Sequence, residues 1–79
     1  MRASVLVRPK EGILDPQGDA VRQSLRKLGF EVSSARVGRV VDLDVDASGA
    51  DEALAQIRRM CGELLANPLI ESYEIRLEE

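Results

Sequence analysis

The 79-residue chain has no histidine, no tryptophan and one cysteine, and its only aromatic residues are Phe30 and Tyr73. Without histidine it lacks the side chain that most often acts as a general base near neutral pH. The lone Cys61 excludes an internal disulfide, and it cannot build a zinc site from the usual cysteine and histidine ligands. Two aromatic residues are too few for a surface that stacks nucleic-acid bases.

The chain is also short of positive charge and of long apolar runs. The chain has eleven basic and fourteen acidic residues, which gives a net charge of −3. A nucleic-acid binder, in contrast, normally carries a basic surface. No apolar run approaches the ~20 residues that span a bilayer, and the apolar stretch near Met1 is too short for a signal peptide. We therefore expect a cytoplasmic protein with neither nucleic acid nor membrane as a partner.

The length predicts a single domain over residues 1–79. A core below about 80 residues seldom supplies more than ~3–5 kcal/mol of net stability, and small domains usually add disulfides, a metal or a second chain. Because the composition argues against disulfides and zinc, we expect self-association into a homodimer or a tetramer.

In the first half of the chain, a strand and a helix are predicted. Residues 3–8 alternate weakly, are partly β-branched and end at Pro9, which is typical of a strand. Asp15-Pro16 is a strong helix start, with an N-cap carboxylate followed by proline at the first helical position. One apolar stripe follows, and Gly29 lies where a helix-ending glycine belongs. The stripe consists of Val21, Leu25 and Leu28.

The second half is predicted to contain an extended region, a helix and a last strand. Residues 30–46 form either two strands or one long bent strand, and we favour two, with Gly38 at the turn or bulge. Ser48 and Asp51 match a capping box that begins a helix ending at Asn67-Pro68. Alternation around residues 73–77 then predicts a closing strand.

This order, β-α-β-β-α-β, predicts an α+β fold of the two-layer ferredoxin-like type, an antiparallel sheet with both helices on one face. Such domains serve many functions, so the fold alone assigns none.

Two groups of residues could bear chemistry, and for both the structural interpretation is favoured. Asp42, Asp44 and Asp46 share one strand face and could attract a hard cation, but a solvated sheet face is expected. Cys61 follows Ile57 by four residues on the apolar stripe of the second helix, so we expect core packing and not a reactive thiol. No phosphate-binding loop is present. We predict no catalytic, cofactor-binding or metal-binding residue in this chain.

Four blocks of the sequence resemble the PurS family, the small S subunit of phosphoribosylformylglycinamidine (FGAM) synthase. The first-loop block resembles the family signature, and the other three resemble its central strands, its second-helix exit and its last strand. The blocks are Lys10-Glu11-Gly12-Ile13-Leu14-Asp15-Pro16-Gln17-Gly18, Val37-Gly38-Arg39 with the alternating Val41, Leu43 and Val45, Met60-Cys61 with Leu64-Leu65-Ala66-Asn67-Pro68, and Ile70-Glu71-Ser72-Tyr73-Glu74. One departure is Arg39, where family members often carry lysine.

The resemblance implies a non-catalytic subunit of a glutamine-dependent C–N ligase complex in purine biosynthesis. In that complex a large synthetase subunit, with ATP and Mg²⁺, converts formylglycinamide ribonucleotide (FGAR) to FGAM, and a glutaminase subunit releases the ammonia. The small subunit is expected to join these two and to help shield the path of ammonia. Lys10, Arg36 and Arg39 are its candidate partner contacts, although strand arginines are more often solvated or paired across strands.

Two other classes remain open from the residues alone. A dimeric ferredoxin-like sensor or effector-binding domain would need a ligand pocket between protomers. An acylphosphatase-like enzyme would need an anion-cradling loop with an arginine, and residues 9–12 offer only Lys10.

Overall fold

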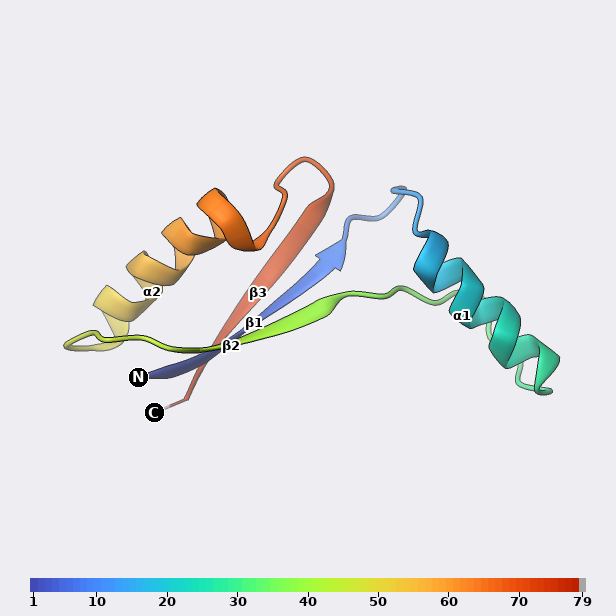
Figure 1. The fold of residues 1–79 in the computed structure, drawn as a ribbon, viewed down its shortest axis with the longest axis horizontal. Coiled ribbons are helices and arrows are strands. Elements are labelled where there is room, and N and C mark those ends of the chain that lie inside the picture. The colour runs from blue at the N-terminus through green and yellow to red at the C-terminus, as the bar shows by residue number, and fades with distance from the viewer. Residues whose placement is uncertain (79) are drawn as a thin grey trace.

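The computed structural model describes residues 1–78, which form an α+β fold. The order of elements is β1 (Arg2–Pro9), α1 (Pro16–Lys27), β2 (Arg39–Asp44), α2 (Ala50–Met60), a π-helical turn (Cys61–Leu65) and β3 (Glu71–Glu78). Figure 1 shows α2 lying over the sheet and α1 standing beyond one end of it. The α+β class and the antiparallel sheet are confirmed.

The described strands form one three-stranded sheet in the order β2-β1-β3. Both neighbours run antiparallel to β1, and the register places Val5 opposite Val41 on one side and opposite Ile75 on the other. The central position of β1 follows from its alternation, because Ala3, Val5 and Val7 are 3%, 0% and 1% exposed.

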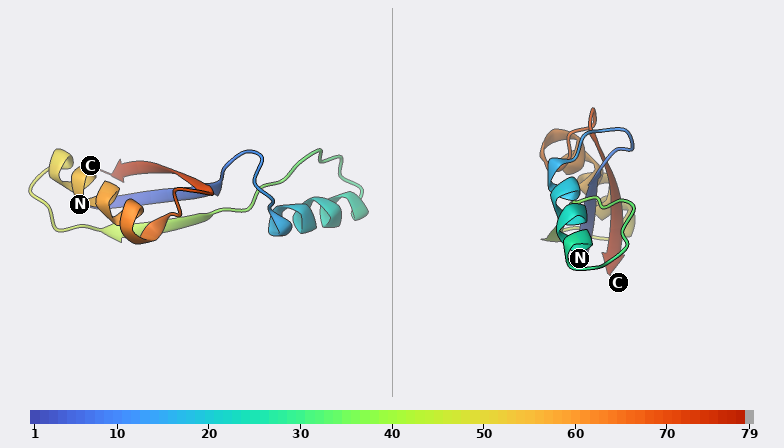
Figure 2. Two further views of the ribbon diagram at one scale, coloured as in Figure 1. Left: turned by 90° about the horizontal axis from the view of Figure 1, so that it is seen from above. Right: turned by 90° about the vertical axis from the view of Figure 1, so that its right-hand side faces the viewer.

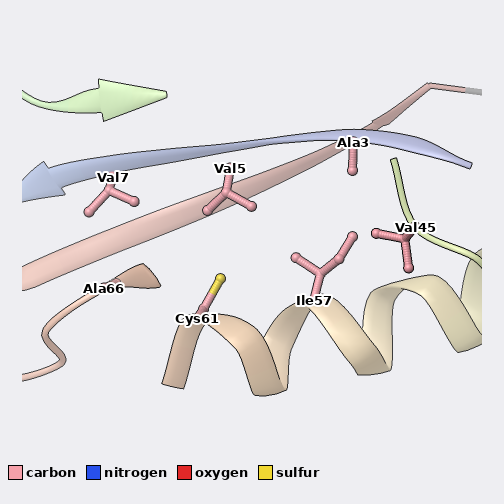
Figure 3. Packing of buried hydrophobic residues seen from close by; sticks show 7 residues of the cluster. All are labelled: Ala3, Val5, Val7, Val45, Ile57, Cys61 and Ala66. Atoms are coloured by element: carbon pink, nitrogen blue, oxygen red, sulfur yellow. The ribbon is translucent and has the colours of Figure 1, made fainter. Parts of the chain in front are cut away.

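The core lies between this sheet and α2. Ile57 and Cys61 point from the helix toward Val5 and Val7, and Val45 and Ala66 complete the cluster with Ala3 (Figure 3). The predicted core packing of Ile57 and Cys61 is therefore confirmed, because neither has exposed surface, whereas Leu64, predicted on the same apolar stripe, is 83% exposed.

The expected position of the first helix is wrong. The two views in Figure 2 show α1 at the opposite end of the molecule from α2, so the helices do not share one sheet face. The molecule is accordingly elongated, measuring 50 × 26 × 14 Å. Its local structure does follow the sequence: Asp15 Oδ1 accepts a 3.0 Å hydrogen bond from the Gly18 amide, and Gly29 takes the positive φ of 100° expected after a helix.

The expectation of two strands in residues 30–46 is also wrong, because only β2 forms there. Residues 31–36 include Glu31, two serines and Arg36, and so offer little apolar surface to cover a sheet. The segment instead returns from α1 in an extended, non-strand conformation. At Gly38 an added Cβ would lie 2.2 Å from the carbonyl oxygen of Val7, so only glycine permits this entry into β2.

The second helix begins with a different cap from the one predicted. Its N-cap is Gly49, and the amide and hydroxyl of Ser48 both donate to the Glu52 carboxylate instead of pairing with Asp51. These bonds lower the pKa of Glu52. The helix then widens into the π-helical turn, closed by the Ala66 amide on the Cys61 carbonyl at 3.1 Å, and ends before Asn67-Pro68 as predicted.

Candidate functional site

Arg39 forms a salt bridge near the connection between α2 and β3. Its guanidinium donates to both Glu71 oxygens, at 2.6 and 3.0 Å, and to the Leu65 carbonyl at 2.6 Å. This fork geometry is available to arginine and not to lysine. The contact raises the pKa of Arg39 and, together with the Asn67 amide, lowers the pKa of Glu71.

Lys10 joins the end of β1 to the turn before β3. Its amide donates to the Ile70 carbonyl at 2.9 Å, and its ammonium donates to the Pro68 carbonyl at 2.6 Å. The same turn is held from within by Asn67, whose side-chain oxygen accepts from the Leu69 amide at 3.1 Å. Lys10 and Arg39 thus fix the 65–71 segment from two sides.

Arg36 lies on the segment that returns from α1, close to the start of that helix. It lines a shallow depression together with Lys10, Asp15 and Arg22. Within residues 1–78 its guanidinium makes no hydrogen bond or ion pair of its own. Its positive charge helps to lower the pKa of Asp15, although hydrogen bonds from the Val37 and Gly18 amides lower that pKa more.

The three candidate contact residues therefore line two depressions, and Arg36 belongs to both. Lys10 and Arg36 share one depression, and Arg36 and Arg39 border a smaller one beside Gly38. Arg39 is already engaged with Glu71, so its charge is largely neutralised within the chain. The sequence showed both charges but gave no signal that residues 32 positions apart would pair.

Asp42 and Asp44 lie on the exposed side of β2, as expected, whereas Asp46 lies beyond the end of that strand. Asp42 accepts a 2.6 Å hydrogen bond from the Ser4 hydroxyl, and Asp44 lies 3.5 Å from the amino terminus. No group of three or more potential ligand residues in the described part of the chain is arranged to hold a metal ion. Burial raises the pKa of the Cys61 thiol, which disfavours the nucleophilic thiolate.

Large apolar side chains are exposed in two regions instead. One region surrounds α1 and comprises Ile13, Leu14, Val21, Leu28 and Phe30. The other runs from the π-helical turn to the start of β3 and comprises Leu64, Leu69, Ile70 and Tyr73, and Val40 is exposed separately on β2. Such patches on a small protein mark surfaces for other proteins. None of the helices described has the length and apolar character needed to cross a bilayer.

Comparison with known sequences gives a match along almost the whole chain. Residues 2–79 match the family described as PurS, phosphoribosylformylglycinamidine (FGAM) synthase. The chain is 42% identical over 76 residues to the phosphoribosylformylglycinamidine synthase subunit PurS of Archaeoglobus fulgidus, covering 95% of each chain. It is 38% identical over 79 residues to the corresponding subunit of Bacillus subtilis, covering 99% of this chain and 93% of the relative.

Solved structures give the same result. The purS subunit of phosphoribosylformylglycinamidine synthase from Thermotoga maritima superposes with a TM-score of 0.89 at 32% identity, covering 95% of this chain and 87% of that one. A chain of the PurLQS structure from Thermotoga maritima superposes with a TM-score of 0.88 at 32% identity, covering 95% and 93%.

Proposed function

The chain belongs to the PurS family of phosphoribosylformylglycinamidine synthase, and we propose that it is the non-catalytic small subunit of that enzyme complex. The similarity along the full chain to the subunit in a PurLQS structure is the observation that carries this proposal. The complex is a glutamine-dependent ligase of purine biosynthesis, in which FGAR, ATP and glutamine give FGAM.

The chemistry of the described residues supports a subunit that positions other proteins. Its only thiol is buried with a raised pKa, and hydrogen bonds that stabilise the charged form lower the pKa of Asp15, Glu52 and Glu71. A general acid or base working near neutral pH needs a pKa close to that pH. The same proposal assigns ATP and Mg²⁺ to the large subunit and the complex to the cytoplasm.

The small subunit joins the synthetase to the glutaminase and helps to shield the ammonia that passes between them. Lys10 and Arg36 offer positive charge toward a partner from one depression. Arg39 acts indirectly, because its bonds to Glu71 and Leu65 hold the 65–71 segment that presents Leu69 and Ile70. Exposed apolar residues beside fixed charges are common at protein interfaces.

The subunit also associates with itself, as a homodimer or a pair of dimers. Within residues 1–78, eight apolar residues make up the buried core, few for a small domain with a single cysteine.

Co-purification tests the bridging role. The tagged chain is mixed with the large synthetase subunit, with the glutaminase subunit, and with both. We expect the two large proteins to be retained together only when this chain is present. Retention of the glutaminase by the synthetase to the same extent without the chain would contradict the proposal. Arg36→Ala should weaken retention, whereas the matched control Arg58→Ala, an exposed arginine on α2, should not.

A further inference from the structure

The small depression beside Gly38 has only basic residues among its charged lining residues. It has a volume of about 130 Å³, and it is lined by Arg8, Arg36 and Arg39 together with Leu6, Val7, Gly38 and Val40. The larger depression near Lys10, in contrast, is lined by three basic and three acidic residues. The smaller depression therefore carries positive charge that no carboxylate in its own lining balances.

The close approach of Gly38 to β1 brings two of these arginines to one place. A Cβ on Gly38 would lie 2.2 Å from the Val7 carbonyl oxygen and 3.3 Å from the Arg8 Cα atom, so the two backbones touch here. Arg8 belongs to β1, whereas Arg36 belongs to the segment that returns from α1, two residues before Gly38. The absent side chain of Gly38 thus allows one arginine from each segment to border the same depression.

Arg8 and Arg36 differ from Arg39 in having no counterion. Within residues 1–78, neither guanidinium makes a hydrogen bond or an ion pair, whereas that of Arg39 is held by Glu71. The carboxylate of Asp15 lies near Arg36, but its two oxygens accept backbone amides instead. Two unpaired positive charges at one depression repel each other, and an anion bound between them replaces this repulsion by attraction.

The size and the charge of the depression fit a phosphate group. Its volume of about 130 Å³ equals that of about four water molecules at ~30 Å³ each, which is enough for one phosphate group and too little for a base and a ribose. Two guanidinium groups match the charge of a phosphate, which approaches −2 near neutral pH, whereas a carboxylate would balance only one of them. The guanidinium fork can also donate two parallel hydrogen bonds to phosphate oxygens.

We propose that Arg8 and Arg36 bind a phosphate dianion in the depression beside Gly38, either as inorganic phosphate or as the phosphate group of a ribonucleotide. The bound phosphate connects β1 to the segment that returns from α1, and so restrains that segment against the sheet. This goes beyond the proposed function, because it gives the small subunit a ligand of its own that needs neither the synthetase nor the glutaminase.

An NMR titration of the isotope-labelled chain with inorganic phosphate tests the site, with potassium chloride at equal ionic strength as the reference. At about pH 8, where phosphate is mostly a dianion, we expect saturable amide shifts at residues 6–8 and 36–40. Arg8→Ala and Arg36→Ala should each weaken binding about tenfold. The matched control Arg58→Ala, an exposed arginine on α2, should bind phosphate as the parent chain does. Shifts that do not saturate, or equal binding by all four chains, would overturn the proposal.

Hydrogen exchange tests whether the bound phosphate connects the two segments. Amide exchange in residues 31–38 should slow when phosphate binds to the parent chain and should stay unchanged in Arg8→Ala, because that variant keeps Arg36 but lacks the contact on β1. The same slowing in both chains would show that phosphate acts elsewhere.

Two further ligands identify the source and the class of the anion. Tighter binding of adenosine monophosphate than of inorganic phosphate would assign the site to a nucleotide, and the reverse would assign it to the free ion; both support the proposal. Acetate that binds as tightly as phosphate would show that the depression accepts a carboxylate, such as an acidic side chain of a partner protein, and would refute it. Because no other subunit is present, either failure leaves the co-purification result for the proposed function untouched.

Discussion

The carboxylate of Asp15 accepts a 2.9 Å hydrogen bond from the amide of Val37, which lies 22 residues further along the chain. The same carboxylate accepts a 3.0 Å bond from the Gly18 amide and so also caps α1. One side chain therefore starts α1 and also closes residues 15–37 on themselves, and this closed segment is called the arm.

Replacing Asp15 should loosen the arm while leaving the sheet folded. Asp15→Ala removes both hydrogen bonds, and Asp15→Asn keeps one acceptor oxygen but turns the other position into a donor. We expect the denaturant midpoint to fall in the order parent, Asn, Ala, with the amides of residues 17–27 losing hydrogen-exchange protection first. Equal midpoints for all three chains would show that the carboxylate does not hold the arm.

Acid should weaken the fold through the same carboxylate. The pKa of Asp15 lies below its ordinary value, as do those of Glu52 and Glu71. Carboxyls with a depressed folded-state pKa stabilise the fold above their unfolded-state pKa, and this contribution is lost as pH falls through the folded-state value. The free energy of unfolding should therefore decline as pH drops below about 4.5. Asp15→Asn should show a shallower decline, and an identical slope would contradict this account.

Replacing Gly18 with a larger residue is expected to destabilise the fold. A Cβ at this position would lie 2.3 Å from the Ala35 carbonyl oxygen and 2.5 Å from Asp15 Oδ2, so the arm must open to admit it. Gly18→Ala should lower the free energy of unfolding by about 1–3 kcal/mol, as overpacking does. Gly62→Ala is the matched control, since nothing lies within 4 Å of its added Cβ. A Gly18→Ala chain as stable as the control would show that the close approach is not needed.

Cys61 should contribute packing and no chemistry. Cys61→Ala removes one buried atom from the core beside Ile57 and should cost about 1 kcal/mol of unfolding free energy, with the activity of the assembled complex unchanged. The native thiol should react with a maleimide only as fast as the fold opens. Rapid labelling under native conditions, or loss of activity in the variant, would be evidence against a purely structural role.

The sheet and α2 could be predicted from the sequence because their patterns specify both period and partner. The alternation of Ala3, Val5 and Val7 matches one face of a strand, and the spacing of Ile57 and Cys61 matches one side of a helix. These two apolar surfaces pack together and form the buried core.

The place of α1 could not be predicted in the same way. An apolar stripe at Val21 and Leu28 shows that a helix side will be buried, and it does not show against which surface or which chain. The pairing of Arg39 with Glu71 could not be predicted from the sequence for a related reason, because it joins two strands that are separated by β1. Both features depend on tertiary placement, which local periodicity does not encode.

In the proposed function, this chain couples the glutaminase to the synthetase. This coupling is tested most directly by measuring FGAM formation from FGAR and ATP in a mixture of the two large subunits, with glutamine or with ammonium as the nitrogen source. Adding the chain should raise the glutamine-dependent rate by at least tenfold and leave the ammonium-dependent rate nearly unchanged. A glutamine-dependent rate that is the same with and without the chain would contradict the claim.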